Sequence, residues 1–306
     1  MGCRTCRRNS IFLLIGLMVL LLYATVPGVA RADLKEVKQR GVLRHLGVTY
    51  ANFVRKIPGG YDGLDVDVMK LFAKHLGVRY QFVNTTWPDL FTDLTGRKQD
   101  VITREYHTEL TEEIKGDIAS NGLTILPNRQ KIVNFSTPIF PTGVWLIAPA
   151  SSSLTPIRPS GKMSEDIKNV KLRLEGHSVL TMNDTCLDEQ FFNFDHSLVK
   201  VKYFTESPLI SDIVPAMMNG MADSTLLDIP DALITLQKWS RDIKIIGPVI
   251  DSQLMGAAVS KSSPEILEAF NNFFKQIWAD GTYRSLVEKY YPSVFLYFDD
   301  FFDIKK

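Results

Sequence analysis

Apolar and polar residues alternate along the chain with two different periods. Residues 42–50 form an apolar run typical of a buried strand, and residues 65–76 carry apolar side chains at helical spacing up to Gly77. Residues 78–83 alternate as a strand does, and residues 87–94 predict a short helix. The order strand, helix, strand, helix is that of βαβ units and predicts an α/β fold.

The same order resumes after a segment rich in serine and proline at residues 150–161, where a second unit is expected to begin. The pattern then predicts strands at residues 178–182, 199–204, 223–227 and 243–246, and helices at residues 164–175, 208–219 and 230–238. A long amphipathic helix follows Pro264 and ends at Gly281. The chain therefore predicts two α/β lobes.

A polar segment interrupts this rhythm at residues 97–116, which include Glu105, Glu109, Glu112 and Glu113. A connection of this length is unusual inside a compact domain and is often functional. We expect a surface loop, with a lip over a binding cleft or a contact with a partner as the alternatives.

The first 32 residues carry the features of an export signal. Three arginines precede an apolar run at residues 11–26, and a small-residue motif that ends at Ala32 follows it. This order is typical of a secretory signal peptide, and the run falls short of the about 20 residues that a transmembrane helix needs. We expect cleavage after Ala32 and a periplasmic mature protein.

The composition of the chain mainly excludes classes of function. The chain of 306 residues has 35 Lys and Arg against 34 Asp and Glu, 45% hydrophobic residues and 3 cysteines. The near-neutral charge excludes a strong electrostatic attraction to nucleic acid or anionic membranes, and three cysteines do not make a disulfide scaffold. Cleavage after Ala32 leaves a slightly acidic chain with Cys186 as its one thiol. Because the mature chain has no P-loop, Cys-x-x-Cys, H-E-x-x-H or G-x-S-x-G motif, we expect no cofactor and no metal.

Six short motifs follow one another in a fixed order. They are GYDGLDVD at residues 60–67, Trp87 with Leu90 and Leu94, NGLTILPNR at residues 121–129, VNFSTPIF at residues 133–140, GMAD at residues 220–223 with Asp228, and DGTY at residues 280–283. In this series the chain resembles the family 3 periplasmic solute-binding proteins, the amino-acid-binding receptors of ABC importers. The similarity extends over residues 40–292.

The resemblance implies a two-lobed type II periplasmic binding protein fold with two crossover strands, whose lobes close on a ligand by a hinge motion. Lobe 1 would comprise residues 33–141 and 253–306, and lobe 2 would comprise residues 142–252 with the crossovers at its ends. The resemblance also implies a monomer that captures a small amino acid, or a related solute with amino and carboxylate groups, for an ABC permease in the inner membrane.

Members of this family bind the α-carboxylate of the ligand with the arginine that corresponds to Arg129. A guanidinium presents a planar pair of donors that matches a carboxylate, and backbone N–H groups beside Gly122 and Thr124 could supply further donors. We therefore expect Asn121, Gly122 and Thr124 to line the ligand site together with Arg129. Outside this motif, Arg129 could also be an ordinary surface charge.

The resemblance pairs the α-amino group of the ligand with Asp228, at the carboxyl end of a predicted strand, where α/β folds place ligand groups. Asp228 could instead cap the helix that begins at Pro230. Tyr50 and Trp87 correspond to positions that flank the ligand, where an aromatic face buries an apolar stem or attracts a cation. Trp87 could equally belong to the core.

The second lobe departs from the family pattern in the turn after its first strand, which reads Asn183-Asp184-Thr185-Cys186. Thr185 is the expected donor to the ligand, at the N-terminus of a helix. The family usually has a glycine in place of Asp184 and often a hydroxyl near Cys186. Cys186 could be an activated thiolate at that terminus, but no motif places a histidine beside it, so we expect a buried unpaired thiol.

Two other functions are open alternatives to a non-catalytic binding protein. Cyclohexadienyl dehydratases have a similar fold and eliminate water from prephenate or arogenate, but their glycine-rich turn and an obvious general acid are missing from the corresponding segment. The same domain also occurs fused to kinases and lytic transglycosylases, so a free-standing sensory adaptor is the second alternative. We expect a receptor that is not an enzyme.

Overall fold

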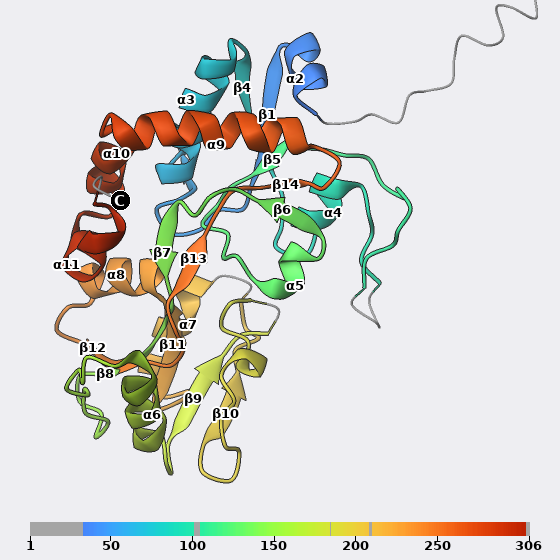
Figure 1. The fold of residues 1–306 in the computed structure, drawn as a ribbon. Helices are drawn as coiled ribbons and strands as arrows, with labels where there is room; N and C mark the ends of the chain where they lie inside the picture. The colour runs from blue at the N-terminus through green and yellow to red at the C-terminus, as the bar shows by residue number, and fades with distance from the viewer. Residues whose placement is uncertain (1–32, 101–104, 184, 208–209, 304–306) are drawn as a thin grey trace, which may run out of the picture.

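The computed structural model describes residues 33–100, 105–183, 185–207 and 210–303, so the predicted signal peptide lies outside the described residues. Two α/β bodies lie one above the other in Figure 1, and the strands β7 (Phe140–Thr142) and β13 (Gln253–Met255) connect them. These two strands pair in antiparallel register and lie where crossover strands are predicted.

The first sheet has the strand order β4-β1-β5-β14-β6. β1 (Val42–Gly47) runs parallel to β4 (Arg79–Asn84) and β5 (Ile118–Ala119), whereas β14 (Ala258–Ser260) is antiparallel to β5 and to β6 (Val133–Phe135). The sheet is therefore built from two parts of the chain that are far apart in sequence.

Helices cover both faces of this sheet. Because side chains alternate along a strand, Leu43 and Leu46 of β1 point to opposite faces and belong to two separate apolar clusters. The cluster with Leu43 contains side chains of α3 (Leu64–Leu76) and α9 (Pro264–Ala279), and the cluster with Leu46 contains those of α4 (Leu90–Thr95). The remaining elements on this side of the molecule are α2 (Leu34–Arg40), α5 (Pro127–Gln130), α10 (Thr282–Tyr290) and the hairpin of β2 (Arg55–Ile57) and β3 (Gly60–Asp62).

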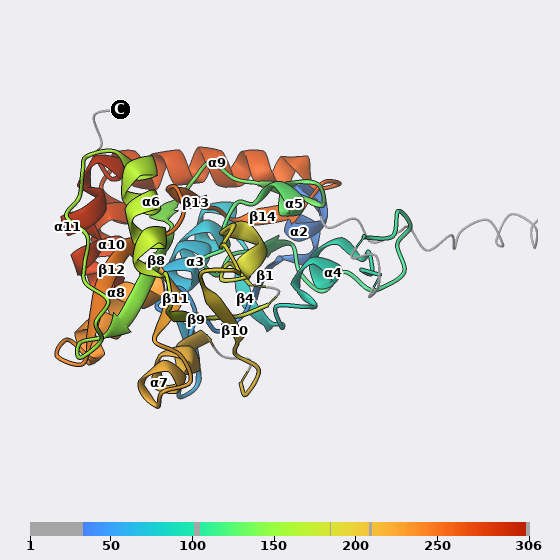
Figure 2. The same cartoon turned by 90° about the horizontal axis from the view of Figure 1, so that it is seen from below.

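The second sheet has the strand order β10-β9-β11-β8-β12. β9 (Ser178–Thr181) runs parallel to β10 (Lys200–Tyr203) and β11 (Ser224–Asp228), and β8 (Val144–Pro149) is antiparallel to β11 and to β12 (Ile243–Pro248). Three helices pack on this sheet, namely α6 (Met163–Arg173), α7 (Ile213–Met218) and α8 (Ile229–Lys238). Figure 2 shows this body from below.

Two predicted helices are shorter than expected. α4 begins at Leu90 rather than at residue 87, and residues 87–89 form a turn in which the N–H of Leu90 already donates to the carbonyl of Thr86 at 2.9 Å. Of the described part of the helix predicted at residues 208–219, α7 is the α-helical part and Ile210–Asp212 form a 3₁₀ turn. Pro215 has no N–H for a helical bond to residue 211, and it is tolerated because it lies in the first turn of α7.

The C-terminal segment contacts both bodies. Its aromatic residues pack on α9, where the ring of Phe301 lies 5.7 Å from the ring of Trp278. Tyr297, in α11 (Phe295–Phe298), lies 5.2 Å from the ring of Trp145 in the second sheet. Within the described part of the chain, no helix combines the length and apolar character that crossing a bilayer requires.

Candidate functional site

Seven of the eight residues predicted to bind a ligand meet in one pocket between the two sheets. The pocket has a volume of about 10 Å³, and Cys186 and Ile210 complete its lining. The seven predicted residues are Tyr50, Trp87, Gly122, Thr124, Arg129, Thr185 and Asp228. The eighth, Asn121, is fully buried beside the pocket, and neither polar atom of its amide has a hydrogen-bond partner among the described residues.

A tight turn after β5 shapes the wall of the pocket on the side of the first sheet. Gly122 has a φ of 67°, and a Cβ at this position would lie 2.4 Å from the ring of Phe53. The buried carboxylate of Asp65 accepts hydrogen bonds from the backbone N–H of Gly122 and the hydroxyl of Ser120, both at 2.8 Å. Burial raises the pKa of Asp65 to about 6. The turn therefore requires glycine, and Asp65 holds it.

Arg129 lies in α5, directly after this turn. Its Nη1 donates to the carbonyl oxygen of Thr124 at 2.9 Å, and its guanidinium lies 5.9 Å from the centre of the Phe91 ring. Burial lowers the pKa of Arg129, which remains charged at neutral pH because the pKa of arginine starts above 12. One of the five N–H donors is used by Thr124, so this cation is oriented before a ligand arrives.

Asp228 forms the opposite wall, at the end of β11. It is buried and accepts hydrogen bonds from the backbone N–H of Ile229 at 2.9 Å, from the hydroxyl of Tyr50 at 3.1 Å and from the hydroxyl of Thr142. The thiol of Cys186 lies 3.7 Å from the same carboxylate. Burial raises the pKa of Asp228 to about 6. The side chain caps α8, as the alternative interpretation predicts, and it also lines the pocket, while its role toward a ligand stays a prediction.

A second carboxyl group lies one helical turn further along α8. Asp231 is buried, and its Oδ2 has no hydrogen-bond partner among the described residues. Burial, followed by the nearby charge of Asp228, raises the pKa of Asp231 to about 7. Sequence reasoning missed this residue and Thr142, because neither belongs to a motif and only the packing of β7 and α8 brings them to the site.

The aromatic side chains lie as expected for a ligand wall. The rings of Tyr50 and Trp87 meet edge to face, with 5.8 Å between their centres. Trp87 is half-buried and packs against both apolar clusters, so its core role and its place in the pocket coexist. Burial and then the charge of Asp228 raise the pKa of Tyr50 well above its ordinary value, which keeps its hydroxyl protonated as a donor.

The turn of the second body differs from the expectation. Among the described residues, no α-helix comes directly after β9, and the next helical element in the chain is a short 3₁₀ turn at Glu189–Phe191. The hydroxyl of Thr185 donates to the carbonyl of Met182 at 2.8 Å and accepts from the N–H of Leu187 at 3.0 Å, so it closes the turn itself. Burial, followed by the charge of Asp228, raises the pKa of Cys186 well above its ordinary value, which favours the thiol over the thiolate.

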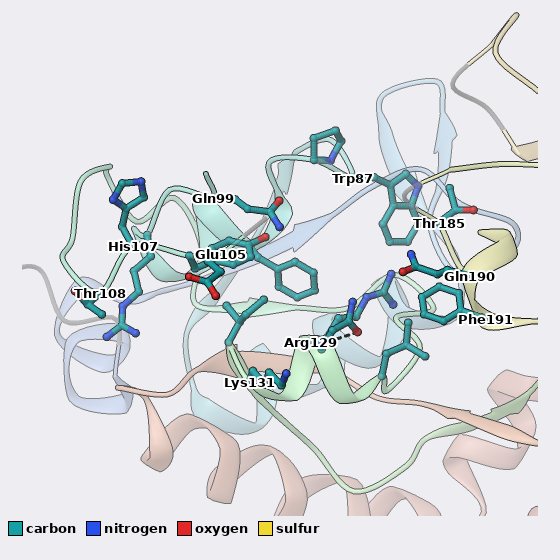
Figure 3. A pocket seen from close by; sticks show the side chains of 17 residues that line it. Trp87, Gln99, Glu105, His107, Thr108, Arg129, Lys131, Thr185, Gln190 and Phe191 are labelled. Atoms are coloured by element: carbon teal, nitrogen blue, oxygen red, sulfur yellow. Dashed lines mark hydrogen bonds between the residues drawn. The ribbon is translucent and has the colours of Figure 1, made fainter. Parts of the chain in front are cut away.

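A larger cavity of about 680 Å³ adjoins the pocket and shares Trp87, Arg129 and Thr185 with it. Figure 3 shows its lining spread from Trp87 and Thr185 at one end to His107 and Thr108 at the other. Six described residues of the polar segment line this cavity, namely Arg97, Gln99, Glu105, Tyr106, His107 and Thr108, while the role of the segment stays a prediction. No group of His, Cys, Asp and Glu side chains in the described residues is arranged to hold a metal ion.

Two α/β bodies are joined by two strands, and the described residues that line the pocket between them include the cation of Arg129 and the buried carboxyl group of Asp228. This arrangement is that of proteins that hold a small solute between two lobes. The chain belongs to the bacterial extracellular solute-binding proteins, family 3, whose profile matches residues 48–111 and 105–293. The predicted family and the predicted type II fold are thereby confirmed.

Characterised relatives have comparable length. The L-cystine-binding protein TcyJ of Escherichia coli K12 is 26% identical over 283 residues, which cover 91% of this chain and 94% of the relative. A mutant of ArgBP from T. maritima has a TM-score of 0.65 and 26% identity, over 85% of this chain and 99% of that one. AncCDT-1, described as an ancestral amino acid-binding protein and a precursor of cyclohexadienyl dehydratase, has a TM-score of 0.64 and 28% identity, over 84% of this chain and 99% of the other.

Proposed function

We propose that this protein is an exported receptor that captures an amino acid, or a related solute with amino and carboxylate groups, for an ABC permease in the inner membrane. The observation that carries the proposal is that Arg129 and Asp228, a cation and a carboxylate, line one pocket. A guanidinium matches a carboxylate and a carboxylate matches an ammonium group, so the pocket is complementary to a zwitterion. The names of the relatives, which bind cystine and arginine, support an amino-acid ligand.

The small volume of the pocket supports a hinged mechanism. A cavity of about 10 Å³ holds about one water molecule, so the head group of a ligand needs the two bodies to separate before it binds. We assign residues 33–141 and 253–306 to lobe 1 and residues 142–252 to lobe 2, with β7 and β13 as the connection that bends. Closure then brings Arg129 of lobe 1 and Asp228 of lobe 2 onto the same molecule.

A ligand screen by thermal shift tests the proposal, because a ligand that binds the folded state alone raises its apparent stability. The panel contains amino acids, polyamines and small carboxylates. We expect stabilisation by compounds with both an amino and a carboxylate group, and calorimetry then gives their affinities. If no amino-acid compound stabilises the protein while a polyamine or a simple carboxylate does, the amino-acid function is wrong.

The remaining parts of the proposal concern export and assembly. We expect residues 1–32 to be absent from protein recovered from the periplasm, and the mature chain to be a monomer. Intact mass measurement and light scattering on that material test both points. A mass that retains the first 32 residues would replace the secreted receptor with a membrane-tethered one.

One observation favours a second candidate function. Asp231 is a buried carboxyl group one helical turn from Asp228 on α8, and its Oδ2 has no hydrogen-bond partner among the described residues, so it could protonate a leaving hydroxyl, as a dehydratase requires. Incubation with prephenate, followed by the absorbance of phenylpyruvate, tests this. We expect no product, whereas product formation that is lost in Asp231→Asn would establish the dehydratase in place of the receptor.

A further inference from the structure

A C-terminal strap, residues 292–302, follows α10 and includes α11. Figure 1 shows α11 below α10, at the height where the two bodies meet. The strands β7 and β13 connect the bodies through the backbone, and the strap adds a contact between them that is made by side chains alone. Its attachment to each body decides what this contact can do.

Arg284 of α10 holds the strap to the first body. Its Nη2 forms an ion pair of 3.2 Å with Asp299, and its Nη1 donates to the carbonyl oxygen of Phe302 at 3.3 Å. The same guanidinium lies 4.4 Å from the centre of the Phe295 ring. The side chain of Phe302 is buried, and its ring stacks on that of Trp278 in α9 with 6.1 Å between their centres. The strap is therefore a fixed part of the first body.

The strap also packs on one of the two connecting strands. The ring of Phe302 meets that of Phe140 in β7 edge to face, with 5.8 Å between their centres. Phe140 is fully buried, and the ring of Tyr291 lies 5.1 Å from it. The hydroxyl of Tyr283 donates to the carbonyl oxygen of Ile139, directly before β7, at 2.6 Å. The anchored end of the strap thus lies against the connection that the proposed hinge motion bends.

Tyr297 reaches from this anchored strap to the second body. Its ring meets that of Trp145 in β8 edge to face, with 5.2 Å between their centres. The side chain of Tyr297 is 51% exposed, so the ring pair accounts for more of its interactions than burial does. Aromatic pairs are favourable while their centres lie about 4.5 to 7 Å apart, so a displacement of about 2 Å takes this pair out of range.

Building on the hinge motion of the proposed function, we propose that Tyr297 and Trp145 form a latch that favours the closed arrangement of the two lobes. The arrangement described here, with a pocket of about 10 Å³, is the closed one. When the lobes separate, Tyr297 moves with lobe 1 and Trp145 moves with lobe 2, so opening loses the pair. The latch holds a captured solute without touching it, and Tyr297 determines affinity from outside the pocket.

Small-angle X-ray scattering of the ligand-free protein tests the latch by measuring the ratio of separated to closed molecules. Tyr297→Ala and Trp145→Ala are each expected to raise this ratio about threefold to tenfold, the factor that one edge-to-face aromatic pair contributes. Tyr297→Phe retains the ring and should match the wild type. Leu296→Ala, which changes the 81% exposed neighbour of Tyr297 in α11, is the matched control and should leave the ratio unchanged.

A double-mutant cycle separates the latch from ordinary packing. If the two rings act through each other, Tyr297→Ala adds no further change to a protein that already carries Trp145→Ala. Independent effects of the two variants would overturn the latch, and so would a ratio that Tyr297→Ala leaves unchanged or lowers, or that Leu296→Ala raises equally. A wild type that scatters as wholly separated lobes would overturn it as well. Because this measurement contains no ligand, these outcomes leave the receptor function standing, which the thermal-shift screen tests by itself.

Discussion

The two walls of the pocket are built in different ways. On the side of the first sheet, residue 122 must be glycine, and Asp65 accepts a hydrogen bond from its N–H. The backbone that leads to Arg129 is therefore fixed in one conformation at this turn. On the side of the second sheet, the turn after β9 is irregular, and the hydroxyl of Thr185 closes it. Asp228 is fixed by the hydrogen bond that it accepts as the N-cap of α8 and by those from two hydroxyl groups. The family motif is intact where backbone geometry dictates the residue, and it departs where side chains alone shape the wall.

The largest effect should come from the rigid wall. Arg129→Ala removes the only cation among the described residues that line the small pocket, and losing one partner of a desolvated ion pair costs about 2 to 5 kcal/mol. We expect the affinity for the amino-acid ligand to fall by at least about 30-fold in calorimetry. Arg129→Lys keeps the charge without the planar pair of donors, so its affinity for the ligand should lie between those of the wild type and Arg129→Ala. An unchanged affinity in Arg129→Ala would remove the basis for the comparison.

The next effect tests whether the turn is as constrained as its geometry indicates. Gly122→Ala adds a Cβ 2.4 Å from the ring of Phe53 and also strains a φ of 67°. We expect a loss of about 2 to 3 kcal/mol in the free energy of unfolding, measured with urea. Gly176→Ala is the matched control, because Gly176 has a φ of 77° but no atom within 4 Å of an added Cβ. Only the strain of about 1 kcal/mol should appear there. Equal losses at both positions would contradict the close approach of Phe53.

On the opposite wall, the effect of Asp228 on the stability of the protein should depend on pH. Because the pKa of Asp228 is about 6 in the folded protein and about 4 in an unfolded chain, the folded state binds this proton more tightly. Its contribution to stability is therefore complete below pH 4 and is lost as the pH rises to about 6. Asp228→Asn should become more stable relative to the wild type across this window, by on the order of 2 kcal/mol, while it weakens ligand binding. Urea unfolding at pH 4 and pH 8 measures the difference, and a difference independent of pH would contradict the buried charge.

The smallest effect concerns the thiol of the irregular wall. Since burial raises the pKa of Cys186 well above its ordinary value, iodoacetamide should label the folded protein at neutral pH far more slowly than the urea-unfolded protein. Mass spectrometry of the two samples measures this ratio. Rapid labelling of the folded protein, slowed by ligand, would instead indicate an activated thiolate in the pocket.

Local rules predicted the elements that depend on local sequence. α3 and α9 follow from apolar residues at helical spacing with a clear end, and Gly77 ends α3 with a φ of 73° as expected. Where local forces compete, the prediction was wrong in detail: Pro215 shortens the helix before Gly220, and the turn at Thr185 replaces an α-helix.

The site was predictable only as far as its motifs reach. The family resemblance named the seven residues that meet in the pocket, of which Tyr50 and Thr185 lie outside the six motifs, and their roles in binding remain predictions. Thr142 and Asp231 became visible only when β7 and α8 were packed against Tyr50 and Asp228. The outer cavity could not be predicted either, because its volume depends on where residues 97–100 and 105–108, which lie far from α5 in sequence, pack in space.

The place of β14 has a consequence for how this chain is made. β14 lies between β5 and β6 in the first sheet, yet it is synthesised after every strand of the second sheet. The segment from β8 to β12 can therefore form its sheet as soon as it emerges, whereas the first sheet still lacks the strand that joins β5 to β6. A ribosome or an export channel that releases the chain from its N-terminus thus delivers the second body first, and completion of the first body becomes the last step of folding.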